Sequence, residues 1–108
     1  MADKWLGKLL DEMDRQNLWE DTLVIFTSDH GHMLGDHGVT GKNCFHAWNG
    51  MCRIPLFIHL PGDERAGQRC AALTQTIDLM PTILEHFGCT AQGPIHGRSL
   101  WPLLYGAQ

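Results

Sequence analysis

The chain has 108 residues, 44% of them hydrophobic, and a formal net charge of −4 with the histidines counted as neutral. This length is enough for one small domain. The acidic balance argues against a nucleic-acid partner, which needs a basic patch, and no apolar run reaches the ~18 residues of a membrane helix.

An amphipathic helix is predicted over residues 3–16, and Asn17 is expected to mark its end. Its charged residues occupy the remaining faces, while the apolar residues share one face: Trp5, Leu6, Leu9, Leu10 and Met13. One side of this helix should therefore pack against apolar groups.

Two strands are predicted next, over residues 22–27 (TLVIFT) and 55–60 (PLFIHL). Both are largely apolar, as expected for strands that are covered on both faces in a parallel sheet. Between them, glycines break up the chain from Gly31 to about Gly50, so this stretch is predicted to be a long loop.

The remainder of the chain is predicted to form a polar turn over residues 63–69, a short third strand over 71–77 and a second helix. Asp78 can cap this helix, Pro81 is tolerated in its first turn, and Gly88 fits its C-terminal end. The tail from Gly97 to Leu104 is apolar without a clear period.

The order helix, strand, long loop, strand, strand, helix is typical of an α/β layer architecture. Three short strands and two helices supply too little cover for a sheet that is buried on both faces, and they leave its edges open. The predicted fold class is therefore α/β, as a partial sheet with flanking helices.

Asp29 and His30 follow the first predicted strand directly. Ligands bind at the carboxyl ends of strands in open α/β sheets, and a carboxylate beside an imidazole suits a divalent metal. Gly31 allows the backbone to turn sharply after them. The alternative is that Asp29 caps a turn and His30 is an ordinary loop residue.

Other polar residues of the loop are weaker candidates. Lys42 could neutralise charge on a metal-bound oxyanion, or it could be a solvated lysine. His46 could reach an anion, His37 could support the metal site, and Asp36 is interpreted as an acceptor that stabilises the loop. Structural roles are favoured for the histidines outside the loop: His59, His86 and His96.

Five stretches together resemble the sulfatase family of the alkaline-phosphatase superfamily. They are TLVIFTSDHGHMLGDHG, Lys42, RIPLFIHLPG, TIDLMPTILEHFG and GRSLWPLL, and they occur in the family's order and spacing. With the opening helix included, the resemblance extends over nearly the whole chain. It implies a partial alkaline-phosphatase-like sheet with flanking helices.

The resemblance also implies roles for particular residues. Asp29 and His30 match two metal ligands, Lys42 matches the lysine that contacts the sulfate ester, and His46 belongs to a Phe-His pair near the substrate pocket. Arg53 resembles a structural arginine. Family enzymes hydrolyse sulfate esters at one divalent metal, usually Ca²⁺, with a formylglycine made from cysteine or serine as the nucleophile.

Three features depart from the family pattern. The Cys/Ser-x-Pro-x-Arg signature for formylglycine surrounds none of Cys44, Cys52, Cys70 or Cys89, and an N-terminal aspartate pair has no counterpart. Ala47-Trp48-Asn49 also lacks an acid that many members carry. Residues 1–108 are therefore expected to be the C-terminal fragment of a sulfatase catalytic domain, with half of a metal site and no activity alone.

Two rivals remain open. One is a phosphonate or phosphate monoester hydrolase of the same superfamily, whose pocket also combines Asp-His with an oxyanion. The other is a non-catalytic binding or structural module that assembles with an N-terminal partner segment. Open strand edges and an uncovered apolar helix face also predict self-association.

Overall fold

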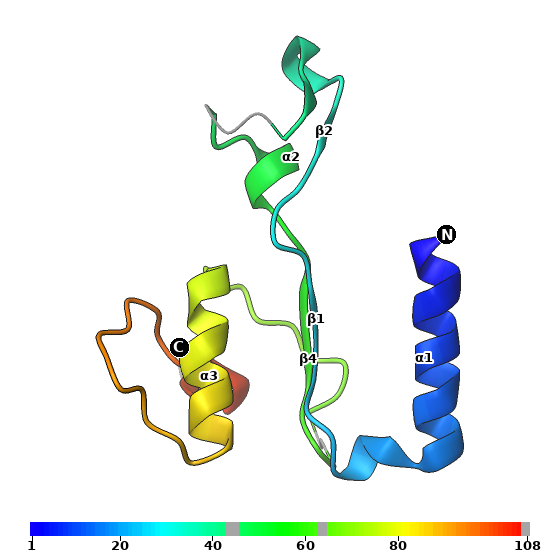
Figure 1. Ribbon diagram of the computed structural model, residues 1–108, viewed down its shortest axis with the longest axis vertical. Helices are drawn as coiled ribbons and strands as arrows, with labels where there is room; N and C mark the ends of the chain where they lie inside the picture. The colour runs from blue at the N-terminus through cyan, green and yellow to red at the C-terminus, as the bar shows by residue number, and fades with distance from the viewer. Residues whose placement is uncertain (43–45, 63–64, 107–108) are drawn as a thin grey trace. The chain divides into compact units, whose positions relative to one another are not determined.

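The structure is a computed structural model, and it describes residues 1–42, 46–62 and 65–106. The chain divides into two compact units, Met1–Ala66 and Gly67–Gln108 (Figure 1). Within the described ranges, no helix is both long and apolar enough to cross a membrane.

The first unit begins with α1 (Ala2–Gln16), as predicted. Asn17 ends it in the left-handed conformation (φ 56°), and its N–H donates to the carbonyl oxygen of Asp14 at 3.1 Å. Met13 is buried, but Trp5 and Leu9 on the same apolar face are 61% and 57% exposed. A short 3-10 helix, η1 (Leu18–Glu20), leads from α1 toward the sheet.

Both predicted strands form, each shorter than expected: β1 is Val24–Thr27 and β4 is Leu56–His59. They pair antiparallel, with Val24 opposite His59, so the prediction of parallel pairing is wrong. A parallel partner requires a crossover of about a dozen or more residues, usually through a helix, whereas this chain doubles back. On one face of the pair, Phe26 and Phe57 stand opposite each other with ring centroids 5.9 Å apart.

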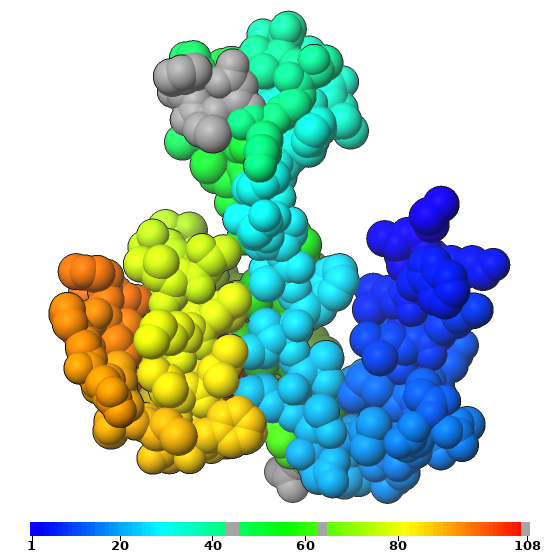
Figure 2. Space-filling model, in the orientation of Figure 1, coloured from blue at the N-terminus to red at the C-terminus, as the bar shows by residue number. Residues whose placement is uncertain are grey.

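The predicted loop between β1 and β4 contains short elements of its own. It comprises β2 (Met33–Leu34), η2 (Asp36–Gly38), β3 (Thr40–Gly41) and α2 (Asn49–Cys52). The strands β2 and β3 form a hairpin whose turn includes Gly35 (φ +118°) and Gly38 (φ +70°). The described residues of this segment gather in a lobe at the end of the β1–β4 pair, which we call the loop lobe (Figures 1 and 2).

The second unit contains η3 (Thr76–Asp78), α3 (Leu79–His86) and α4 (Trp101–Leu104). The predicted strand over 71–77 is wrong: residues 71–75 are coil, and the 3-10 helix begins at Thr76. Residues 71–77 are exposed and form no ladder, and β-propensity without a pairing partner does not make a strand. Pro81 and Gly88 (φ +63°) lie where predicted, and Asp63 and Glu64 of the expected turn are outside the described residues.

A buried polar pair, Asp78 and Thr82, ties the tail to α3. Asp78 stands before α3 as predicted, but its carboxylate accepts the N–H groups of Gln75 and Arg98, both at 2.8 Å, instead of capping that helix. Thr82 is fully buried, and its hydroxyl donates to the Asp78 carbonyl and accepts the N–H of Leu100. These bonds satisfy groups that would be costly to bury unpaired.

Candidate functional site

The turn that follows β1 is fixed by hydrogen bonds and by close backbone packing. The hydroxyl of Ser28 donates to the carbonyl of His30 at 2.9 Å, and the N–H of Gly31 donates to the carbonyl of Met51 at 2.8 Å. A Cβ atom on Gly31 would stand 2.8 Å from the carbonyl carbon of Gly50 and closer still to its oxygen. Only glycine therefore lets this turn pack against α2.

Asp29 presents an ionised and accessible carboxylate at this turn. Its side chain is 84% exposed, and its Oδ1 accepts the backbone N–H of His30 at 2.9 Å. This hydrogen bond stabilises the charged form and lowers the pKa of Asp29 below its ordinary value. One oxygen is thus engaged with the backbone, while Oδ2 faces the imidazole of His30.

His30 is oriented so that Nε2 can coordinate. Its Nδ1 lies 2.8 Å from the carbonyl oxygen of Gly31, an acceptor that selects the tautomer protonated at Nδ1 in the neutral ring. The lone pair then lies on Nε2, which is 3.4 Å from Asp29 Oδ2. Two ligands of one divalent ion at right angles stand roughly 3 Å apart, given metal–ligand distances of about 2.0–2.6 Å. The pair therefore fits two adjacent coordination positions.

Two donors do not complete a metal site. Among the residues that the structure describes, no group of three or more His, Cys, Asp or Glu side chains is placed to hold an ion. Calcium takes six to eight oxygen ligands, so Asp29 and His30 can supply only part of its shell.

The β2–β3 hairpin determines where Lys42 lies. Gly41 pairs with Met33, so the hairpin returns the chain to the level of the residues just after His30, and Lys42 follows there at the surface. Lys42 takes part in an interaction of its own, and no contact between Lys42 and Asp29 or His30 is described. Its role as an oxyanion contact therefore stays a prediction.

His46 and His37 both stack on Trp48. The ring centroids are 4.6 Å apart for His46 and 4.3 Å for His37, with interplanar angles of 10° and 23°. His37 has a left-handed backbone (φ 56°), which is uncommon outside glycine. The structure thus brings two of the predicted loop histidines together around an indole, and Phe45 of the Phe-His pair lies outside the described residues.

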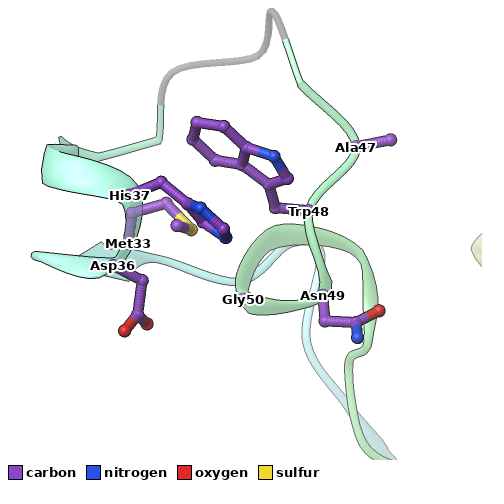
Figure 3. A pocket seen from close by; sticks show the side chains of 7 residues that line it. All are labelled: Met33, Asp36, His37, Ala47, Trp48, Asn49 and Gly50. Carbon is purple, nitrogen blue, oxygen red and sulfur yellow. The ribbon is translucent and has the colours of Figure 1, made fainter.

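Two of these residues, His37 and Trp48, also line a pocket of about 480 Å³ in the loop lobe (Figure 3). Its lining consists of one buried thioether, two rings, two short polar side chains and small residues: Met33, Asp36, His37, Ala47, Trp48, Asn49 and Gly50. Trp48 and Asn49 were not predicted from the sequence to line a pocket. A tryptophan among glycines and histidines downstream of a ligand turn was the available signal.

Two of the histidines outside the loop, His59 and His86, make ring contacts. His59 Nε2 lies 3.1 Å from the carbonyl oxygen of Trp19 and meets its indole edge-on, and His86 stacks on Trp101 with centroids 5.6 Å apart. These contacts agree with the structural roles that the sequence favoured.

Comparison with known proteins adds independent information. A family model described as Sulfatase matches residues 1–89. The chain is 46% identical over 103 residues to the multifunctional alkaline phosphatase superfamily protein PehA of Trinickia caryophylli, covering 94% of this chain and 20% of that protein. It is 32% identical to an N-acetylglucosamine-6-O-sulfatase of Bacteroides thetaiotaomicron, with 95% and 18% coverage.

A solved structure has the same fold as this chain. The structure of BT4656 in complex with its substrate D-glucosamine-2-N,6-O-disulfate aligns with a TM-score of 0.85 and 31% identity, over 97% of this chain and 21% of that one. The predicted α/β, alkaline-phosphatase-like partial sheet is thereby confirmed. The chain spans about a fifth of the length of these relatives. By the family match and the shared fold, it belongs to the sulfatase family.

Proposed function

We propose that residues 1–108 form the C-terminal part of a sulfatase catalytic domain, a sulfuric ester hydrolase in which Asp29 and His30 are two of the metal ligands. The observation that carries this proposal is the pair of donor atoms, Asp29 Oδ2 and His30 Nε2, 3.4 Å apart at the exposed end of β1. The remaining ligands and the formylglycine nucleophile would come from parts of the catalytic domain outside these residues.

Residues of this chain would hold the metal ion and stabilise negative charge on the ester oxygens. A bound divalent ion, Ca²⁺ by family resemblance, would polarise the sulfate oxygens as a Lewis acid. Asp29 stays ionised because the His30 N–H stabilises its carboxylate, and the Gly31 carbonyl keeps the Nε2 of His30 free to coordinate. Lys42 would stabilise negative charge on the ester oxygens, and His46 would contact the substrate from its stack on Trp48.

A second candidate is hydrolysis of phosphate or phosphonate monoesters. It is favoured by the 46% identity to a protein described as a multifunctional member of the alkaline phosphatase superfamily. A pocket that joins a metal to an oxyanion contact suits both sulfate and phosphate esters. The charge and geometry of the transferred sulfuryl or phosphoryl group, rather than the alcohol that leaves, separate the two candidates.

The metal ligands can be tested on the 108-residue chain by NMR. Substoichiometric Mn²⁺, a paramagnetic probe, should broaden the resonances of Asp29 and His30 before any others, and Asp29→Ala should abolish this effect. Asp11→Ala, an exposed aspartate on α1, is the matched control and should change nothing. Broadening that is centred elsewhere or survives Asp29→Ala would refute the assignment.

Calcium should bind this chain only weakly, with a Kd above about 1 mM, because two ligands leave most of its coordination shell to water. Calorimetry measures this directly. Zinc or copper could bind more tightly through imidazoles, which they prefer, and such binding would not identify the native ion. Tight calcium binding that persists in Asp29→Ala would mean that the site lies elsewhere.

The reaction can be tested in a chimera in which residues 1–108 replace the matching stretch of the Trinickia caryophylli protein. The chain alone should hydrolyse neither 4-nitrophenyl sulfate nor 4-nitrophenyl phosphate, since it lacks the covalent nucleophile. In the chimera, Lys42→Ala should lower kcat about 10²-fold, as expected for loss of one charge-stabilising group, while Lys4→Ala should not. A preference for the phosphate ester would select the second candidate, and a folded chimera that hydrolyses neither ester would refute both.

A further inference from the structure

We propose that α2 positions the metal-ligand pair. The backbone of Gly50 and Met51 holds Gly31 in place, and the carbonyl of Gly31 selects the ring nitrogen of His30 that is left to coordinate. The role in metal binding rests on the proposed function, whereas the selection of the His30 tautomer does not. Gly50 and Met51 are positioning residues in this inference, because they act through Gly31 and not as ligands.

The neutral ring of His30 has two candidate partners for its single N–H. Nδ1 lies 2.8 Å from the carbonyl oxygen of Gly31, whereas Nε2 lies 3.4 Å from Asp29 Oδ2. The first distance is that of a hydrogen bond, and the second exceeds the ordinary range of about 2.7–3.2 Å. A proton on Nε2 would occupy the lone pair that coordinates a metal. The place of the Gly31 carbonyl therefore decides whether His30 can be a ligand.

Met51 holds the peptide unit that joins His30 to Gly31. The N–H of this unit, which belongs to Gly31, donates to the carbonyl of Met51 at 2.8 Å. Its carbonyl, which belongs to His30, accepts the hydroxyl of Ser28 at 2.9 Å. Because a peptide unit is planar, partners at both of its ends fix its orientation. Only the rotations about the Cα of Gly31 are then left to move the Gly31 carbonyl.

Gly50 limits those rotations by direct contact between two backbones. A Cβ on Gly31 would stand 2.8 Å from the carbonyl carbon of Gly50 and 3.0 Å from the Cα of Met51. Gly50 in turn packs against Met33 of β2, since a Cβ on Gly50 would stand 2.8 Å from the Met33 sulfur. Met33 is 1% exposed, and a side chain in a close-packed interior has little room to move aside. The position of α2 therefore depends on its fit against Met33.

These contacts couple the loop lobe to the ligand pair. Met33 and Gly50 both line the pocket of the loop lobe (Figure 3), and Gly50 reaches the turn that carries the ligands through Gly31. Coordination at Nε2 requires the same tautomer of His30 that the docked α2 favours. By thermodynamic linkage, metal binding and the docking of α2 should each stabilise the other.

The test measures the tautomer of His30 by ¹⁵N NMR of its imidazole at alkaline pH, without metal. In the parent chain the proton should lie on Nδ1. Gly50→Ala should shift the tautomer ratio toward Nε2–H by about fivefold, as expected when one hydrogen bond is weakened. Gly7→Ala is the matched control and should leave the ratio unchanged, because a Cβ there would meet nothing within 4 Å.

A second substitution shows whether the effect passes through the packing of α2. Met33→Val shortens the side chain that a Cβ on Gly50 would meet, and valine suits the backbone of a strand. The double variant Gly50→Ala/Met33→Val should therefore recover the tautomer ratio of the parent. The Kd for Mn²⁺, read from the broadening at Asp29 and His30, should rise about fivefold in Gly50→Ala and recover in the double variant, because only one tautomer coordinates.

Three results would overturn the inference: a parent proton on Nε2, an unchanged ratio in Gly50→Ala, or a changed ratio that Met33→Val does not restore. Unaltered chemical shifts of α1 and β1 show that each variant folds. The tautomer is read without metal, so the two proposals can fail separately. A ratio that responds as expected, without Mn²⁺ broadening at Asp29, would refute the metal site alone, and broadening with an indifferent ratio would refute the positioning alone.

Discussion

At Gly97, a Cβ atom would stand 2.5 Å from the carbonyl carbon of Ile77 and closer still to its oxygen. The next residue, Arg98, donates its backbone N–H to the buried carboxylate of Asp78, so the chain passes close to η3 at this point. One missing side chain therefore allows the tail to reach the polar pair of Asp78 and Thr82. The close approach of the tail to η3 explains why residue 97 is a glycine. No left-handed backbone conformation is needed to explain it.

Gly97→Ala should destabilise the second unit by about 1–3 kcal/mol, because the methyl group forces the tail away from η3. Gly93→Ala is the matched control, since its Cβ would meet nothing within 4 Å, and it should be neutral. Hydrogen exchange of the Arg98 and Leu100 amides measures the effect. Equal protection of these amides in both variants would mean that the close approach does not stabilise the unit.

The element α1 carries its own charge network on the exposed side. Arg15 Nε donates to Glu12 Oε2 at 2.8 Å, and Gln16 Nε2 donates to Glu12 Oε1. These side-chain hydrogen bonds, that of Arg15 first, lower the pKa of Glu12 below its ordinary value of 4.5. The bonds span i to i+3 and i to i+4, the spacings at which side chains meet on a helix.

The C-terminal half of α1 should lose helicity in acid. Because the folded state lowers the pKa of Glu12, the stabilisation is present in full above pH 4.5 and is lost as the pH falls through the lowered pKa. ¹³Cα shifts of residues 8–16, followed from neutral pH downward, measure this. Glu12→Gln should be less helical at pH 7 and flatter with pH, and Asp11→Asn should behave as the parent. An unchanged acid response in Glu12→Gln would exclude Glu12 as its source.

At the scale of the whole molecule, few apolar side chains are fully covered. Among the described residues, the buried hydrophobic side chains are Met13, Met33, Met51, Leu60 and Leu100. By contrast, Phe26 and Phe57, which pair across β1 and β4, are 41% and 66% exposed. The two-stranded sheet therefore offers an apolar face and two open edges to other chains or segments.

The 108-residue chain should self-associate at high micromolar concentration through this face. Light scattering should give a mass above 12.1 kDa that increases with concentration. Phe57→Glu should reduce the association, whereas Leu73→Glu, at a fully exposed position in coil, should not. A monomer at all concentrations that also melts cooperatively at high temperature would count against this prediction.

The sequence by itself determined the features that depend on neighbouring residues. Helical periodicity with an Asn17 stop predicted α1, apolar runs predicted β1 and β4, and Gly88 marked the end of α3. It also placed Asp29 and His30 at the turn after β1, because an apolar run that ends in Ser-Asp-His-Gly must leave the sheet there. The family motifs lie in these same local stretches.

Only the tertiary structure decided which distant groups meet. The antiparallel pairing of β1 with β4, the partners of Asp78 and the coil over residues 71–75 depend on contacts between residues far apart in the chain. The pocket of the loop lobe is of the same kind, since His37 and Trp48 meet only after the β2–β3 hairpin and α2 fold over the ligand turn. Local pattern fixes backbone preference, but pairing and pocket geometry follow from packing, which periodicity does not encode.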